Sequence, residues 1–119
     1  MTVTILIVED DAAFAYAAWR HLEANGYRVV TVNSSMAALK KLDTESVDIV
    51  VTDIRLGKGE PHGLALARMI KNKSPNLPVI LVTAYPDLVK TESDLPGQIF
   101  FKPVELSTLR NAVESALQK

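Results

Sequence analysis

The chain has 119 residues, a net charge of −1 and no cysteine. The absence of cysteine excludes disulfides, thiolate metal sites and thiol catalysis, and the near-neutral charge offers no basic surface for nucleic acid or an anionic membrane. No apolar run approaches the roughly 20 residues that span a bilayer, and no charged leader precedes an apolar segment. We therefore expect a single cytoplasmic domain over residues 1–119, without a membrane partner.

A strand and a helix begin the chain. Residues 3–8 are a continuous apolar run of strand length, and Glu9, Asp10 and Asp11 follow it. Apolar residues and one histidine then recur at helical spacing: Phe14, Ala17, Ala18, His21 and Leu22. We expect Asp11 to cap the start of this helix, and Asn25-Gly26 to end it.

The next units are a strand at residues 28–32, a helix, and a central strand. Ser34 or Ser35 is expected to cap the helix, whose apolar stripe is Met36, Leu39 and Leu42. The central strand ends at Asp53, and its β-branched apolar residues indicate burial on both faces. The loop over residues 54–62 is rich in glycine and charge and cannot continue a helix or strand.

The last third of the chain repeats the alternation, with one irregular segment. A helix with the stripe Leu66, Ala67 and Ile70 precedes an apolar strand at residues 79–82, which leads to Thr83. Residues 84–97 have a weak apolar stripe between two prolines, so we expect a short, irregular or absent fourth helix. A strand at 98–101 leads into Lys102-Pro103. The final helix carries Leu106, Leu109, Val113, Ala116 and Leu117.

Strands that alternate with helices indicate an α/β fold with a parallel sheet covered on both faces. We expect a doubly wound five-stranded parallel sheet in the order 2-1-3-4-5, with right-handed crossovers. Ligands bind outside the carboxyl ends of such strands, where the strand order reverses. This order brings five polar strand-end residues into one crevice: Glu9, Asp10, Asp53, Thr83 and Lys102.

The chemistry of this crevice suits transfer of a phosphoryl group to Asp53. A carboxylate and its phosphoryl target are both negative, so catalysis must consist of positioning and charge neutralisation. Lys102 offers a compact positive charge, and Thr83 offers a hydroxyl donor. The simpler alternative is that Asp53 ends the strand and caps the following turn.

A hard divalent cation such as Mg²⁺ fits the same crevice. Mg²⁺ prefers oxygen ligands and is usually held by one or two carboxylates. We expect Asp10 and Asp53 to supply these carboxylates, and Glu9 to act on the metal directly or through a water. The backbone carbonyl of Arg55 is the candidate for a further ligand.

Four segments together resemble the response-regulator receiver domain of the CheY-like superfamily, over essentially the whole chain. They are Val8-Glu9-Asp10-Asp11, Thr52-Asp53, Thr83-Ala84 and Phe101-Lys102-Pro103. The resemblance implies a flavodoxin-like fold and a phosphoacceptor module of a two-component or phosphorelay pathway. It also implies a signalling protein rather than an enzyme, in which only self-phosphotransfer and autodephosphorylation occur.

The resemblance assigns roles to individual residues. It implies that Asp53 takes phosphate from a sensor histidine kinase or a phosphotransfer protein, and that Glu9 and Asp10 hold Mg²⁺. Thr83 and Lys102 match the switch hydroxyl and the lysine of the family. Phosphorylation is then expected to alter the interaction with a downstream partner or output domain, and the Lys102-Pro103 bond is expected to be cis.

Three features depart from the family pattern. Ile99 stands where the family usually has an aromatic switch residue, so switching must use another group. The segment from Asp53 to Gly63 is longer than usual, which predicts a flap beside the site, with His62 as an exposed loop residue. Thr83 precedes Lys102 by only 19 positions, which again predicts a reduced fourth helix.

Two alternatives remain open at this point. A pseudo-receiver would bind partners without being phosphorylated, and Ile99 and the irregular segment are compatible with it. A haloacid-dehalogenase-type phosphatase also uses Asp, Thr, Lys and acids around Mg²⁺. That chemistry needs a second aspartate two residues after the nucleophile, where this chain has Arg55.

Overall fold

The computed structural model describes residues 2–56, 63–89 and 94–118. Its strands are β1 (Thr4–Val8), β2 (Arg28–Val32), β3 (Ile49–Asp53), β4 (Val79–Thr83) and β5 (Gln98–Phe101). Its helices are α1 (Ala12–Ala24), α2 (Ser35–Thr44), α3 (Gly63–Lys73), the 3₁₀ turn η1 (Pro86–Leu88) and α4 (Leu106–Leu117).

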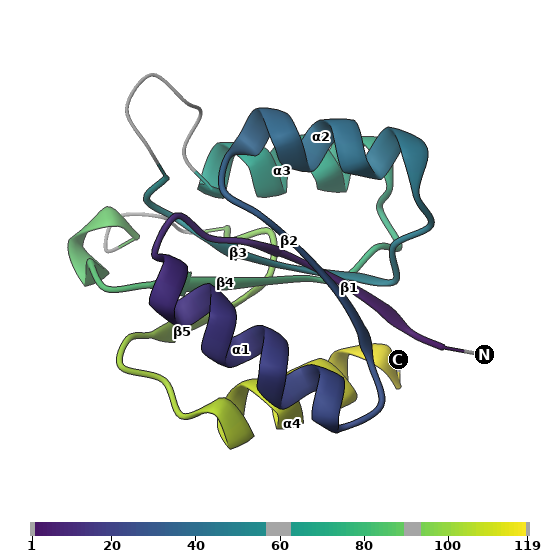
Figure 1. The fold of residues 1–119 in the computed structure, drawn as a ribbon. Helices are drawn as coiled ribbons and strands as arrows, with labels where there is room; N and C mark the ends of the chain where they lie inside the picture. Colours follow the sequence, from purple (N-terminus) through teal and green to yellow (C-terminus); the bar gives the residue numbers. More distant parts are fainter. Residues whose placement is uncertain (1, 57–62, 90–93, 119) are drawn as a thin grey trace.

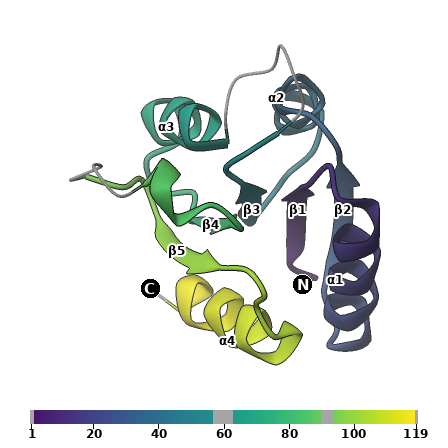
Figure 2. The same cartoon turned by 90° about the vertical axis from the view of Figure 1, so that its left-hand side faces the viewer.

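All five strands are parallel and lie in the order β2-β1-β3-β4-β5. The predicted fold class and strand order are therefore confirmed. Helices α1 and α4 cover one face of the sheet, and α2 and α3 cover the other (Figures 1 and 2). The carboxyl ends of the strands lie on the left in Figure 1, on the same side as η1.

The sheet separates two apolar cores. Strands β1, β3 and β4 are buried along their whole length, because both of their faces are covered by helices. One core joins the strands to α1 and α4 through residues such as Leu22 and Leu109. The other joins them to α2 and α3 through residues such as Ala38 and Leu66.

The helix ends follow the predicted capping chemistry. The Asp11 carboxylate accepts hydrogen bonds from the backbone N–H groups of Ala13 and Phe14, at 3.1 and 3.2 Å. Ser34, rather than Ser35, caps α2, because its hydroxyl accepts from the N–H of Ala37 at 3.1 Å. Gly26 follows α1 with φ of 94°, a conformation that favours glycine.

The segment between β4 and β5 is irregular, as predicted. Among its described residues the regular element is η1, and no α-helix is present there. The last helix of the chain is thus α4. The predicted flap, with His62, lies outside the described residues.

Gly63, the first residue of α3, lies directly against the end of β3. Its N–H donates to the carbonyl of Ile54 at 2.6 Å, and a Cβ atom at this position would overlap the carbonyl of Asp53. Sequence reasoning used Gly63 only to count loop length and missed this close approach. The contact requires glycine, because the obstacle is backbone that carries the key aspartate.

Substitution Gly63→Ala should lower the free energy of unfolding by about 1–3 kcal/mol, because α3 must move away from β3 to accommodate a methyl group. Urea denaturation followed by circular dichroism measures this change. The matched control is Ala65→Ser on the exposed face of the same helix, which should change stability by less than about 0.5 kcal/mol. Equal stability of Gly63→Ala and the parent chain would contradict the packing described.

Candidate functional site

Three carboxylates gather at the carboxyl ends of β1 and β3. Glu9 and Asp10 directly follow β1, and Asp53 is the last residue of β3. One oxygen from each of the three lies within 4.8 Å of the others. Glu9 and Asp53 are buried, at 4% and 8% exposure, whereas Asp10 is exposed. The cluster therefore has two buried acids and one acid that is open to solvent.

Lys102 joins the two buried acids. Its ammonium Nζ donates to Glu9 Oε1 at 2.8 Å and to Asp53 Oδ2 at 3.0 Å. The backbone aims this side chain, because the Lys102 N–H donates to the carbonyl of Thr83 at 2.8 Å and so extends the β4–β5 pairing. The Lys102-Pro103 bond is cis, as predicted.

An aromatic ring covers the lysine. The ammonium of Lys102 lies 4.6 Å from the centre of the Phe14 ring, a cation–π contact from the first turn of α1. Sequence reasoning placed Phe14 only in the apolar stripe of the helix. The position of Phe14 close after the three acids was the signal that could have linked it to the site.

Burial and the contact between Glu9 and Lys102 shift the pKa values of both side chains. Burial raises the pKa of Glu9 to about 7, although hydrogen bonds from Lys102 and from the Asp11 N–H act in the opposite direction. Burial alone would lower the pKa of Lys102, but its hydrogen bonds to Glu9 and Asp53 outweigh this and raise the pKa. The lysine thus stays charged, while the glutamate holds its proton more tightly than usual.

The second oxygen of Asp53 points to the following loop. Asp53 Oδ1 accepts from the Arg55 N–H at 3.1 Å, so both carboxylate oxygens have partners. The observed contact between Arg55 and Asp53 is thus the hydrogen bond from the backbone amide of Arg55. The ligand role expected for its carbonyl stays a prediction. The Arg55 side chain extends over the ring of Tyr85, with 4.7 Å between the guanidinium carbon and the ring centre.

Thr83 ends β4 and is fully buried. Its hydroxyl accepts from the Tyr85 N–H at 2.9 Å and lies 3.5 Å from the Tyr85 carbonyl, to which it donates. Sequence reasoning placed Thr83 beside the crevice but missed Tyr85, which contacts both Thr83 and Arg55. Ile99 packs against the α2–α3 core, so position 99 has an apolar role.

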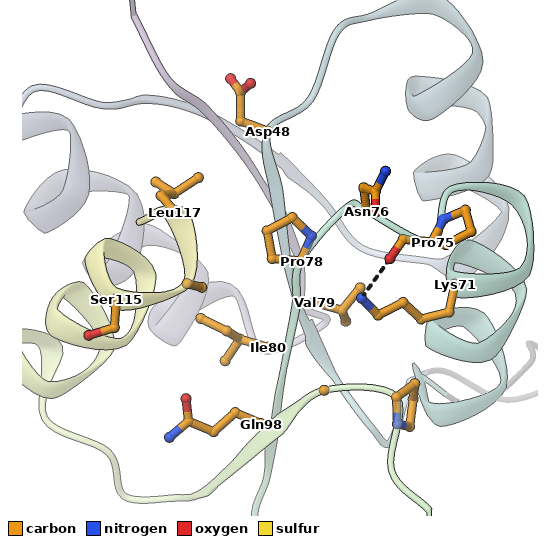
Figure 3. A pocket seen from close by; sticks show the side chains of 13 residues that line it. Asp48, Lys71, Pro75, Asn76, Pro78, Val79, Ile80, Gln98, Ser115 and Leu117 are labelled. Atoms are coloured by element: carbon orange, nitrogen blue, oxygen red, sulfur yellow. Dashed lines mark hydrogen bonds between the residues drawn. The ribbon is translucent and has the colours of Figure 1, made fainter. Parts of the chain in front are cut away.

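Two cavities border the sheet at different places. A cavity of about 490 Å³ between α1 and β2 has Glu9 and Asp10 in its lining, together with Tyr16 and Trp19. A cavity of about 640 Å³ lies at the opposite end of the strands (Figure 3). Its lining includes Val79, Gln98 and Ser115, and no member of the carboxylate cluster. The larger cavity is therefore separate from the candidate site.

The donor set fits a hard divalent cation. Carboxylate oxygens are the ligands that Mg²⁺ prefers, and three of them lie close together here. The ammonium of Lys102 supplies one positive charge against these three acidic side chains.

The family is evident from comparison with known proteins. A family model described as the response regulator receiver domain matches residues 5–114. The chain belongs to the response-regulator receiver family. The transcriptional regulatory protein GlrR of Escherichia coli strain K12 is 33% identical over 118 residues, which are 97% of this chain and 26% of GlrR. The chain thus spans about a quarter of the length of this relative.

Solved structures agree with this assignment. The response regulator TrrA from Thermotoga maritima, in complex with Mg²⁺-BeF, has a TM-score of 0.88 and 26% identity, over 98% of this chain and 100% of TrrA. A receiver protein from Sinorhizobium medicae has a TM-score of 0.88 and 28% identity, over 98% of this chain and 95% of that protein.

Membership of the family supports several statements about the class of protein. Receiver domains are signalling modules of two-component systems that work with histidine kinases and output domains, and they bind Mg²⁺ at an acidic pocket. The pseudo-receiver alternative is not favoured, and the family match is to receivers rather than to phosphatases. Within the described ranges, none of the helices has the length and apolar character needed to span a bilayer.

The stability of the metal-free protein should fall as the pH rises from about 5 to 8. Because Glu9 binds its proton more tightly in the folded state, its contribution to stability is full below the unfolded pKa of 4.5 and is lost through about pH 7. Thermal or urea unfolding across this range, with a chelator present, measures the slope. Glu9→Gln should flatten the slope, and Glu114→Gln, an exposed control on α4, should leave it unchanged. A slope identical in the parent chain and Glu9→Gln would contradict the pKa shift.

Proposed function

We propose that this chain is a phosphoacceptor module, phosphorylated on Asp53. The observation that carries the proposal is the bridge from Lys102 Nζ to Glu9 and Asp53, residues 93 and 49 positions away in sequence. An isolated structural aspartate at a strand end does not need a buried ammonium and two neighbouring acids. A nucleophilic carboxylate that receives a negative phosphoryl group does.

In the proposed step, one carboxylate oxygen of Asp53 bonds to the phosphorus of a phosphohistidine, and the nitrogen–phosphorus bond breaks. The electron pair of that bond stays on the imidazole nitrogen, which takes a proton from solvent. The chain holds Asp53 in place through the Arg55 N–H and Lys102, and Lys102 neutralises charge on the phosphoryl oxygens. Thr83 offers its hydroxyl to another of these oxygens.

Glu9, Asp10 and Asp53 are the proposed holders of Mg²⁺, with the Arg55 carbonyl as a further ligand. When bound, Mg²⁺ supplies positive charge next to the phosphoryl oxygens. The fit of three adjacent carboxylates to a hard cation supports this assignment.

The wider setting is proposed from the family. The phosphodonor is a sensor histidine kinase or a phosphotransfer protein, and the receiver domain spans residues 1–119 in the cytoplasm. It acts as a switch for a downstream protein or output domain, without direct contact with nucleic acid. Self-phosphotransfer and autodephosphorylation are the reactions expected of it, rather than turnover of a substrate.

The direct test is incubation with acetyl phosphate and Mg²⁺, followed by intact mass spectrometry. We expect the mass of one phosphoryl group to be added to the parent chain and not to Asp53→Asn. The matched control is Asp43→Asn, which alters an exposed aspartate and should label like the parent chain.

Two other outcomes would overturn the proposal. A chain that takes no label from any small phosphodonor, although it is folded, would be a pseudo-receiver. Steady release of phosphate from a phosphate ester would instead indicate a phosphatase.

A further inference from the structure

Tyr85 contacts both Thr83, at the end of β4, and Arg55, in the loop that follows Asp53. Its N–H and carbonyl hold the Thr83 hydroxyl, and its ring lies against the guanidinium of Arg55. Arg55 in turn is tied by its amide to Asp53. Tyr85 as a whole is 48% exposed. A chain of contacts therefore leads from the carboxylate of Asp53 to an aromatic group on the surface.

The two groups held by Tyr85 are those best suited to follow a charge change at Asp53. In the described structure, the hydroxyl of Thr83 donates over 3.5 Å, which is long for an O–H···O bond. The guanidinium of Arg55 makes a cation–π contact at an exposed site, which is weaker than a charge-assisted hydrogen bond to phosphate. A phosphoryl group on Asp53 offers both of them stronger acceptors nearby.

We propose that Tyr85 is the aromatic switch residue of this receiver. Phosphorylation draws the Thr83 hydroxyl and the Arg55 guanidinium from Tyr85 to the phosphoryl oxygens, so the ring changes its surroundings and alters the surface. This inference rests on the proposed phosphorylation of Asp53, and it names the side chain through which phosphorylation changes the surface. It also accounts for Ile99, which is partly buried against the α2–α3 core and has no ring to move.

Fluorine NMR on protein labelled with 3-fluorotyrosine tests the proposal. The chain has three tyrosines, and Tyr85→Phe identifies the signal of Tyr85 by its loss. On addition of Mg²⁺ and beryllofluoride, a phosphoryl mimic, we expect the Tyr85 signal to shift. The signal of Tyr27, which packs against the α1–α4 core, should stay in place.

Substitutions of arginine separate the ring contact from general effects of charge. In Arg55→Gln, the Tyr85 signal of the free protein should already lie near the position that it has with beryllofluoride in the parent chain, and its further shift should be largely lost. The matched control is Arg20→Gln, because Arg20 makes the corresponding contact with Tyr16, at 5.9 Å. Arg20→Gln should leave the Tyr85 signal unchanged.

Substitutions of threonine test the other contact. In Thr83→Ala, hydrogen exchange of the Tyr85 amide should be about three- to tenfold faster, as the loss of one hydrogen bond implies. Thr83→Ser keeps the hydroxyl and should restore slow exchange. An unchanged exchange rate in Thr83→Ala would contradict the proposed hold on Tyr85.

Intact mass spectrometry with acetyl phosphate distinguishes failure of this inference from failure of the proposed function. If Asp53 is labelled but the Tyr85 signal does not respond to beryllofluoride, Tyr85 is not the switch residue and the phosphoacceptor role stands. If Asp53 takes no label, both proposals fall together.

Discussion

The contact of one lysine with two buried acids organises the functional end of this protein. Glu9 directly follows β1 and Asp53 ends the adjacent strand β3, and without a cation their charges would repel each other in a poorly hydrated location. Lys102, which follows the edge strand β5, pairs with both acids and lies against the ring of Phe14. The two buried acids therefore share one positive charge.

The backbone fixes these side chains with little freedom. Asp53 is the last residue of a fully buried strand, and the start of α3 at Gly63 presses on its carbonyl group. Lys102 continues the hydrogen bonding of β5 to β4 through the carbonyl of Thr83. The positions of Asp53 and Lys102 are therefore set by sheet pairing, while Arg55 and Tyr85 lie in the loops, where movement costs less.

Sequence reasoning recovered the fold because the signals for it are local. Apolar strands, helical stripes and the cap at Asp11 each depend on neighbours in sequence. The strand order was predicted because it brings the polar strand-end residues, Lys102 included, into one crevice. The contacts of Tyr85 with Arg55 and Thr83, and of Phe14 with Lys102, depend on side-chain directions between separate loops and elements. No periodic pattern encodes these directions. The close packing of Gly63 likewise depends on the angle at which a helix meets a strand.

The site is assembled from strands distributed along the whole chain. Glu9 follows the first strand, and Lys102 follows the last. During synthesis, Glu9 and Asp53 are therefore both added to the chain well before Lys102, their cationic partner. The acidic pair therefore gains its ammonium partner only when the fifth strand pairs with β4 at the sheet edge.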